Sequence, residues 1–263
     1  MHALTVVDTI GRHHRCVLRR WVDGHVDDGP ELVEREARVL ESLERTDIPA
    51  PRLLGLDPSG EECGDPALLM SFLDGHVELT PDDPDDWVNQ IASMLVRIHH
   101  APIEAPIAES WLNRERLVVP EWSSDPDLWR DAFSLMEERP PVSPSCFIHH
   151  DYQQFNLLWR CGKISSVVDW VWGSSGSSTI DVAHARLNLS VLYSSELAQR
   201  FLDLYESMSG QVVERWWDVE GLLKYLPGWG GFLQQQAGRR LTVDFDGMHE
   251  RVEATLHAAL RRD

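Results

Sequence analysis

The sequence lacks the patterns of a metal finger, a disulfide-rich domain or a membrane anchor. Its four cysteines show no Cys-x-x-Cys spacing, so neither a zinc site nor a disulfide framework is indicated. No apolar run approaches the roughly 20 residues needed to cross a bilayer, and the N-terminus has no basic-then-apolar signal pattern. The Ser- and Gly-rich run 173–178 lacks the Gly-Lys-Ser/Thr ending of a P-loop. We therefore expect a cytoplasmic protein with free thiols and no membrane partner.

Basic residues are also scarce relative to acidic ones. The 263 residues carry 24 Lys and Arg against 43 Asp and Glu, a formal charge of −19. Nucleic acid is an unlikely partner because two polyanions repel each other at long range. A cationic small molecule would be attracted, although a net acidic surface also simply favours solubility. With 43% hydrophobic residues, the chain is long enough for one large domain or two lobes.

Hydrophobic periodicity divides the chain into two parts. In the first part, β-rich segments at 4–10 and 16–21 flank Gly11 as in a hairpin, and further strands are expected at 53–56 and 67–73. Between them, 31–45 has helical spacing and acid-before-base pairs four residues apart. After the Asp74-Gly75 turn, the pattern is mainly helical to the C-terminus, interrupted by short strands around a turn at 160–163. We predict an α+β fold with one lobe at 1–73 and a larger helical lobe at 74–263.

Three oxygen-bearing side chains have an ordered spacing in the region 146–183. Asp151 and Asn156 follow an apolar run, as on a tight loop leaving a strand, and Asp169 follows a second β-branched run thirteen residues later. Transfer of a γ-phosphoryl group depends mainly on positioning and charge neutralisation. A carboxylate at 151 can orient an acceptor hydroxyl and take its proton, while Asn156 and Asp169 offer the oxygen ligands that Mg²⁺ prefers.

The complete motif is His149-His150-Asp151, Asn156, Asp169 and then Asp181-Val182-Ala183. It resembles the catalytic core of the eukaryotic-like kinases and, more narrowly, the aminoglycoside phosphotransferase (APH) family of small-molecule kinases. The resemblance implies a two-lobed protein-kinase-like fold. It also implies ATP or GTP as co-substrate, Mg²⁺ held by Asn156 and Asp169, Asp151 as the catalytic base, and His149 and Asp181 as structural braces of the loop.

The same resemblance assigns the nucleotide contacts. Arg19 stands on the strand that carries the kinase phosphate-binding lysine, and Glu36 stands where the helix glutamate pairs with that cation. A register slip of one residue would turn Arg20 inward instead. The run 68–75 resembles the strand that leads into the interlobe hinge, where backbone groups of about Ser71 and Leu73 would hold the adenine edge.

Two departures from the family leave alternatives open. The strand and glycine-bearing loop that cover the phosphates are missing or shortened here, which is compatible either with a start site set too far downstream or with a catalytically impaired, kinase-like protein that binds a nucleotide or another ligand. Gln153-Gln154-Phe155 replaces the common His-Pro-Gly, which argues against protein-kinase activity but not against small-molecule transfer. A His-His-Asp metal site is a further alternative, although zinc usually recruits a third ligand at helical or Cys-x-x-Cys spacing.

The acceptor is expected to be a small, amine-bearing molecule of the aminoglycoside kind. A choline-like alcohol, a homoserine-like amino acid and a macrolide remain alternatives, and the oligomeric state is left open. By resemblance, the late helical region builds the acceptor pocket. An acidic residue there could meet a cationic acceptor, although each candidate is more often a solvated helix-face charge. The tryptophans and acids concerned are Trp216, Trp217, Trp229, Asp218, Glu220 and Asp244.

Overall fold

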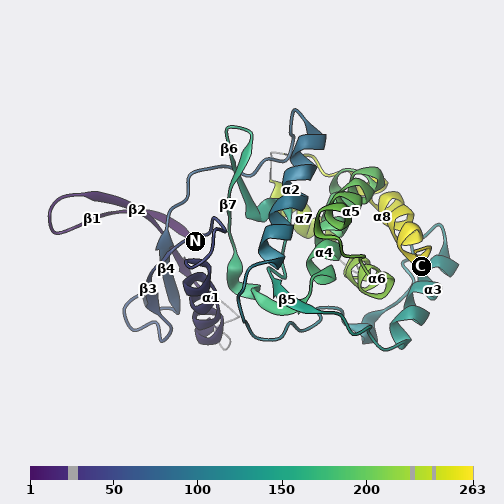
Figure 1. The fold of residues 1–263 in the computed structure, drawn as a ribbon, viewed down its shortest axis with the longest axis horizontal. Coiled ribbons are helices and arrows are strands. Elements are labelled where there is room, and N and C mark those ends of the chain that lie inside the picture. Colours follow the sequence, from purple (N-terminus) through teal and green to yellow (C-terminus); the bar gives the residue numbers. More distant parts are fainter. Residues whose placement is uncertain (23–28, 226–228, 239–240, 263) are drawn as a thin grey trace. The chain divides into compact units, whose positions relative to one another are not determined.

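The computed structural model describes residues 1–22, 29–225, 229–238 and 241–262, and Figure 1 shows their helices and strands. These residues form two compact units. The first comprises 1–77 together with 156–173, and the second comprises 78–155 together with 174–263. The lobes expected at 1–73 and 74–263 remain a prediction, and each compact unit is described below by itself.

The first unit contains an antiparallel sheet of four strands in the order β1-β2-β4-β3. Its strands are β1 (His2–Val7), β2 (His13–Arg20), β3 (Leu53–Asp57) and β4 (Ala67–Ser71). The hairpin expected around Gly11 joins β1 to β2, with His2 opposite Leu18 and Val7 opposite His13. Gly11 has a φ of 82°, a conformation that glycine adopts without steric cost. Every residue of β1 is exposed, so this edge strand contributes little to the core.

Helix α1 (Gly29–Leu43) packs against β3 and β4 of this sheet. Val33, Ala37 and Leu40 are buried because their spacing of three and four residues places them on one helix face. On the exposed side, Glu34 and Arg38 form the expected pair, with 2.7 Å between Oε2 and Nη2. The helix ends at Leu43, before the first of the prolines at 49 and 51.

A second hairpin completes the first unit. Strands β6 (Leu157–Arg160) and β7 (Lys163–Val167) are antiparallel, and Cys161 and Gly162 form the tight turn between them with φ values of 51° and 71°. Positive φ at both central residues is typical of the turns that match strand twist. The hairpin predicted at 160–163 is therefore confirmed. After β7, the short 3-10 helix η3 (Trp170–Trp172) packs against α1.

The second unit is mainly helical. Its helices are α2 (Pro84–His99), η1 (Arg114–Arg116), α3 (Pro126–Glu137), α4 (Thr179–Leu192), α5 (Ser195–Ser209), α6 (Arg215–Leu223), α7 (Trp229–Ala237) and α8 (Phe245–Leu260). Helix α4 packs against α5, α6 and α8, and nearly all of its side chains are buried. It is thus the central element of the unit. None of the described helices is long and apolar enough to cross a membrane.

Side-chain caps explain where two helices of this unit begin. Asp83 accepts hydrogen bonds from the N–H groups of Asp85 and Asp86 at the start of α2, and Asp125 accepts one from Leu128 at the start of α3. Proline follows both caps, where its fixed φ suits the first helical position. These local signals agree with the helices predicted from the sequence.

The segment that carries the predicted base, Asp151, begins on a strand of the second unit. Strand β5 (Ser145–Ile148) pairs antiparallel with β8 (Ser174–Ser177), with Ile148 opposite Ser174. The Ser- and Gly-rich run after Asp169 therefore contributes a strand that its composition does not reveal. A 3-10 turn, η2 (Gln154–Asn156), follows the loop that carries Asp151.

Candidate active site

The loop after β5 is held by a buried carboxylate. Asp181, in the first turn of α4, accepts hydrogen bonds from the backbone N–H groups of His149 (2.7 Å) and His150 (2.6 Å). These bonds pin the backbone immediately before Asp151. A bracing role for Asp181 is what the sequence led us to expect, and these contacts support it.

His150 has a φ of 70°, which is unusual for a residue with a side chain and costs of order 1–3 kcal/mol. The Asp181 bond to its N–H holds this conformation, and its ring stacks on Trp111 with centroids 4.3 Å apart. Strained backbone of this kind concentrates at functional sites. The loop is therefore shaped to present the next residue, Asp151.

The carboxylate of Asp151 is one-fifth exposed and contacts two neighbours. Nε2 of His184 lies 2.9 Å from its Oδ1, and Nε2 of Gln153 donates a hydrogen bond of 2.8 Å to the same oxygen. His184 is buried on α4. His184 and Trp111 were not predicted from the sequence. For His184 a signal existed, because it lies three residues after Asp181 and hence on the same helix face.

Behind the loop, Asp181 belongs to a buried polar chain. Nε2 of His99 lies 3.2 Å from its Oδ2, and Nδ1 of the same ring lies 2.7 Å from the hydroxyl of Tyr205. Burial alone would raise the pKa of Asp181, but its bond to His99 and the nearby charges of His99 and His149 outweigh this effect and lower it. Asp181 is therefore an ionised brace in the described geometry. His149 lies edge-on to Tyr152 beside it.

In the first unit, Asn156 and Asp169 lie at the same end of the β6–β7 hairpin. Leu157 pairs with Val167, and the N–H of Val168 donates to the carbonyl of Asn156 at 2.9 Å. Asp169 has a φ of 66°, a second sparsely populated conformation at a predicted functional residue. The backbone thus brings the predicted carboxamide and carboxylate ligands to adjacent chain positions across the hairpin.

Arg19 bridges two acids within the same unit. Its Nη1 lies 3.2 Å from both carboxylate oxygens of Glu36 and 2.6 Å from Oδ1 of Asp169. Burial alone would lower the pKa of Arg19, but the two nearby carboxylates raise it above the ordinary value. For Glu36, burial dominates over the attraction of Arg19 and raises the pKa to about 7. The only lysines of the sequence are Lys163 and Lys224, so the cation of this sheet is arginine.

The alternative that Arg20 points inward is wrong. Nη1 of Arg20 donates to the carbonyl of Cys63 and lies 3.4 Å from Asp65, on the opposite side of β2 from Arg19 as strand alternation requires. The residue that meets Glu36 and Asp169 is Arg19.

The predicted hinge segment follows β4. The N–H of Ser71 donates to the carbonyl of Arg52, and its hydroxyl accepts from the N–H of Arg52, so these two groups of Ser71 are already engaged within the protein. Further on, His76 pairs with Trp159 of the hairpin. A side chain at Gly75 would approach Leu158 and Ser165 at about 3 Å, so glycine is required there. The adenine contacts of Ser71 and Leu73 remain a prediction.

The three acidic residues considered for the acceptor pocket have different partners. Asp218 forms a fully buried ion pair with Arg186, and Asp244 caps α8 and pairs with Arg251. Both therefore serve the fold. Glu220 is buried, bonds to the hydroxyl of Ser110, and lies 3.1 Å from Nζ of Lys224.

The tryptophans of this region also differ. Trp216 is buried, whereas Nε1 of Trp217 donates to the hydroxyl of Ser143. The side chain of Trp229 lies outside the described residues. Lys224 lies 5.9 Å from the ring centroid of Trp111, so Trp111 and Glu220 are connected through this lysine. Among these candidates, Glu220 is the acid whose surroundings include a residue, Trp111, that stacks on the loop carrying Asp151.

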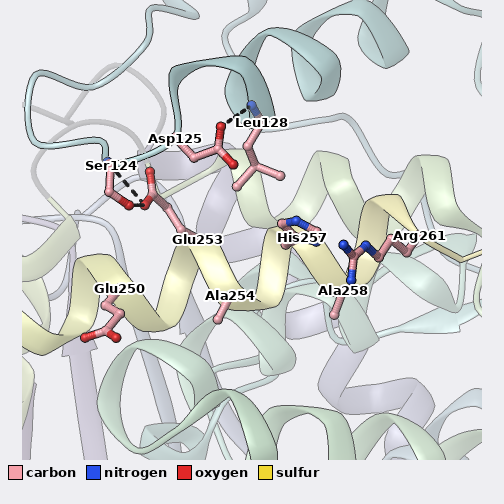
Figure 2. A pocket seen from close by; sticks show the side chains of 9 residues that line it. All are labelled: Ser124, Asp125, Leu128, Glu250, Glu253, Ala254, His257, Ala258 and Arg261. Carbon is pink, nitrogen blue, oxygen red and sulfur yellow. Dashed lines mark hydrogen bonds between the residues drawn. The ribbon is translucent and has the colours of Figure 1, made fainter.

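A separate hollow of about 490 Å³ lies between α3 and α8 of the second unit. Figure 2 shows Glu253 extending from α8 toward Ser124. Burial would raise the pKa of Glu253, but hydrogen bonds from Ser123, Ser124 and Trp129 lower it. Glu253 is thus held as an internal brace. Within the described residues, no group of three or more His, Cys, Asp or Glu side chains is arranged to hold a metal ion.

Comparison with known families identifies the class of protein. Residues 3–217 match the model of the phosphotransferase enzyme family, APH. This match covers most of the chain, which therefore belongs to that family. The kinase-like α+β fold class expected from the sequence is confirmed.

Solved structures agree with the fold. A Ralstonia eutropha JMP134 protein classed as an aminoglycoside phosphotransferase aligns with a TM-score of 0.62 at 16% identity, over 98% of this chain and 88% of that one. An aminoglycoside-3'-phosphotransferase of type VIII aligns with a TM-score of 0.59 at 18% identity, over 84% and 87% of the two chains. A macrolide 2'-phosphotransferase of type I gives 0.57 at 18% identity, over 97% and 86%.

A curated relative is much longer than this chain. The Arabidopsis thaliana protein IBR3, named as an acyl-CoA dehydrogenase, is 24% identical over 217 aligned residues, which cover 67% of this chain. The matched region spans 25% of that relative's length. This similarity relates the chain to one part of a larger protein.

Proposed function

We propose that this member of the family transfers the γ-phosphoryl group of ATP or GTP to a hydroxyl of a small, amine-bearing molecule. The observation that best supports the proposal is that hydrogen bonds hold both loops on which the predicted residues lie. Asp181 pins the loop that ends at Asp151, and the Val168 bond joins the chain positions of Asn156 and Asp169. Hydrogen bonds within the protein thus hold both loops, and these loops carry polar side chains that a purely structural loop would not need.

In this proposal Asp151 is the general base. As the acceptor oxygen forms its bond to the γ-phosphorus, the hydroxyl proton passes to the Asp151 carboxylate. The bond from the γ-phosphorus to the β,γ-bridging oxygen breaks, and the nucleoside diphosphate leaves with that electron pair. Partial exposure suits Asp151 to this role, because the group must meet an incoming hydroxyl while its contacts to His184 and Gln153 limit its rotation.

Magnesium would be held by Asn156 and Asp169. The donor set fits, because carboxylate and carboxamide oxygens are the hard ligands that this ion prefers, and the Asp169 carboxylate is about one-quarter exposed, at 28%. When bound, the ion neutralises phosphate charge. Arg19 lies beside Asp169 and would contribute a second positive charge to the phosphates, with Glu36 fixing its guanidinium.

The small-molecule acceptor is supported by the family and by charge. Solved structures with this fold include enzymes named for aminoglycosides and for macrolides. A net charge of −19 favours the approach of a cationic acceptor over an anionic one. Glu220 is the buried acid proposed to face the amine, although Lys224 offsets part of its charge.

The experiment is a phosphate-transfer assay with a panel of acceptors. Radiolabelled γ-phosphate from ATP or GTP is followed into gentamicin, streptomycin, a macrolide, choline and homoserine, with Mg²⁺ present. Label in gentamicin or streptomycin supports the proposal, and label only in the macrolide, choline or homoserine replaces the aminoglycoside-like acceptor class. Transfer to none of them would contradict it.

A kinase-like protein that binds but does not transfer is the second candidate. It is favoured by the sheet edge at β1, where every residue is exposed. Thermal-shift titration with MgATP, together with the transfer assay, separates the candidates, since ligand binding raises the melting temperature by mass action. Absence of transfer would favour this second candidate, as a nucleotide-binding protein if millimolar MgATP gives a shift and as a protein that binds another ligand if it gives none.

A further inference from the structure

His184 is a buried residue of α4 that contacts the proposed catalytic base. It lies three residues after Asp181 on the same helix, so both side chains project from one face. Asp181 binds the loop through its backbone at His149 and His150. His184 instead reaches the side chain of Asp151, with 2.9 Å between Nε2 and Oδ1. Side chains from one face of α4 therefore contact both the backbone of the loop and the carboxylate of Asp151.

The imidazole itself is fixed by packing. It is 1% exposed, and Trp111 lies edge-on to it at 5.9 Å with an interplanar angle of 87°. The same indole stacks on His150, the residue with positive φ that precedes Asp151. A buried ring of this kind does not reorient freely, so the direction from which Nε2 meets Asp151 is set by the fold.

Gln153 provides a second contact to the same carboxylate oxygen, at 2.8 Å. The two contacts differ in origin, because Gln153 lies on the loop and moves with it, whereas His184 belongs to the central helix. A carboxylate held only by its own loop would be oriented relative to the loop alone. His184 ties that orientation to the rest of the second unit.

We propose that His184 is a positioning residue for Asp151: the close contact of its Nε2 with Oδ1, at 2.9 Å, holds the carboxylate in the orientation from which it takes the acceptor proton. The inference rests on the proposed function, since it assigns His184 a part in the same transfer. His184 does not touch the acceptor or the nucleotide in this assignment. Removing the imidazole should therefore lower kcat and leave KM for MgATP nearly unchanged.

The variants separate this role from simple packing. His184→Leu fills a similar volume without a polar atom, and His184→Gln restores a polar nitrogen at a comparable distance from the carboxylate. His249→Gln is the matched control, because His249 also packs on a tryptophan, with its ring centroid 4.1 Å from that of Trp122.

Transfer from labelled MgATP to gentamicin and streptomycin, and hydrolysis of MgATP by water, are measured for each variant. We expect His184→Leu to lower kcat about 10- to 100-fold, part of the range that general-base catalysis contributes, with His184→Gln recovering most of the loss.

A double-variant cycle tests whether His184 acts through Asp151. In an Asp151→Ala background the carboxylate is gone, so adding His184→Leu should produce no further loss of the residual rate. An additional 10-fold loss would overturn the proposal, as would an unchanged kcat in the single variant His184→Leu. If Asp151→Ala itself leaves turnover unchanged, the proposed function fails instead, and the two failures are thus distinguishable.

If no transfer rate can be detected, NMR spectroscopy tests the contact between His184 and Asp151 without turnover. ¹⁵N NMR of histidine-labelled protein, assigned with His184→Gln, reports whether Nε2 of His184 carries the proton. We expect a protonated Nε2 whose resonance shifts in Asp151→Ala and not in His249→Gln. A resonance unaffected by Asp151→Ala would show that the two side chains do not interact, and would overturn the proposal.

Discussion

Nη1 of Arg19 lies 2.6 Å from Oδ1 of Asp169 and 3.2 Å from both carboxylate oxygens of Glu36. One guanidinium thus neutralises an acid from α1 and the acid that follows β7. Because Arg19 and Asp169 are 150 residues apart in the chain, their contact joins the sheet to the hairpin within the first unit. It also places the cation proposed for phosphate next to the carboxylate proposed for Mg²⁺.

Replacing this cation should weaken nucleotide binding. A charge-assisted hydrogen bond contributes about 1.5–3 kcal/mol, so Arg19→Met is expected to raise the Kd for MgATP roughly 10- to 100-fold. Isothermal titration calorimetry measures the change. Arg20→Met is the control, since Arg20 contacts Cys63 and Asp65 instead. Weaker binding in Arg20→Met with normal binding in Arg19→Met would contradict the assignment.

The brace formed by Asp181 should make stability depend on pH in a defined direction. Its pKa is lowered from 3.8 in the folded protein, so its ionised form stabilises the fold above that value. This contribution is lost as pH falls through the lower folded pKa. Asp181→Asn should lower the free energy of unfolding by about 1–3 kcal/mol at pH 7, because a buried N–H loses its acceptor.

Urea unfolding at several pH values measures this effect. The stability difference between the unmodified protein and Asp181→Asn should shrink as pH falls below 3.8. Asp131→Asn, an exposed change on α3, serves as the control and should leave stability unchanged at pH 7. A difference that grew on acidification would refute the ionised brace.

Asp218 should prove structural and not an acceptor contact. It and Arg186 are both completely buried in their ion pair, and removing one partner of such a pair typically costs about 3–5 kcal/mol. Asp218→Asn should therefore lower the melting temperature strongly. Arg200→Gln, which breaks the exposed pair with Asp85, should change it little. A folded, stable Asp218→Asn protein with a raised KM for the acceptor would reverse this assignment.

Local patterns predicted most of the elements correctly. The spacing of Val33, Ala37 and Leu40 identified α1, and the Cys161-Gly162 turn identified the β6–β7 hairpin. These features depend on residues a few positions apart, whose preferences are expressed in the sequence itself. Strand β8 was not predicted because Ser174–Ser177 has little strand propensity, and it exists through pairing with β5.

The neighbours of the site were less accessible to prediction. Asp151 meets His184 across 33 positions of the chain, and His150 stacks on Trp111 across 39. Periodicity tells which face of a helix is buried, but it does not tell which loop that face will meet. The buried pair of Arg186 and Asp218 was missed for the same reason, and Asp218 was consequently considered as a pocket acid.

The most direct test of the account is the turnover of Asp151→Ala. MgATP-dependent transfer of labelled phosphate to the best acceptor of the panel is measured alongside the melting temperature and the MgATP-dependent thermal shift. The account predicts a kcat lower by about 10²- to 10⁴-fold, with stability and nucleotide binding close to those of the unmodified protein. Unchanged turnover in a folded Asp151→Ala protein would contradict the central claim that this carboxylate takes the acceptor proton.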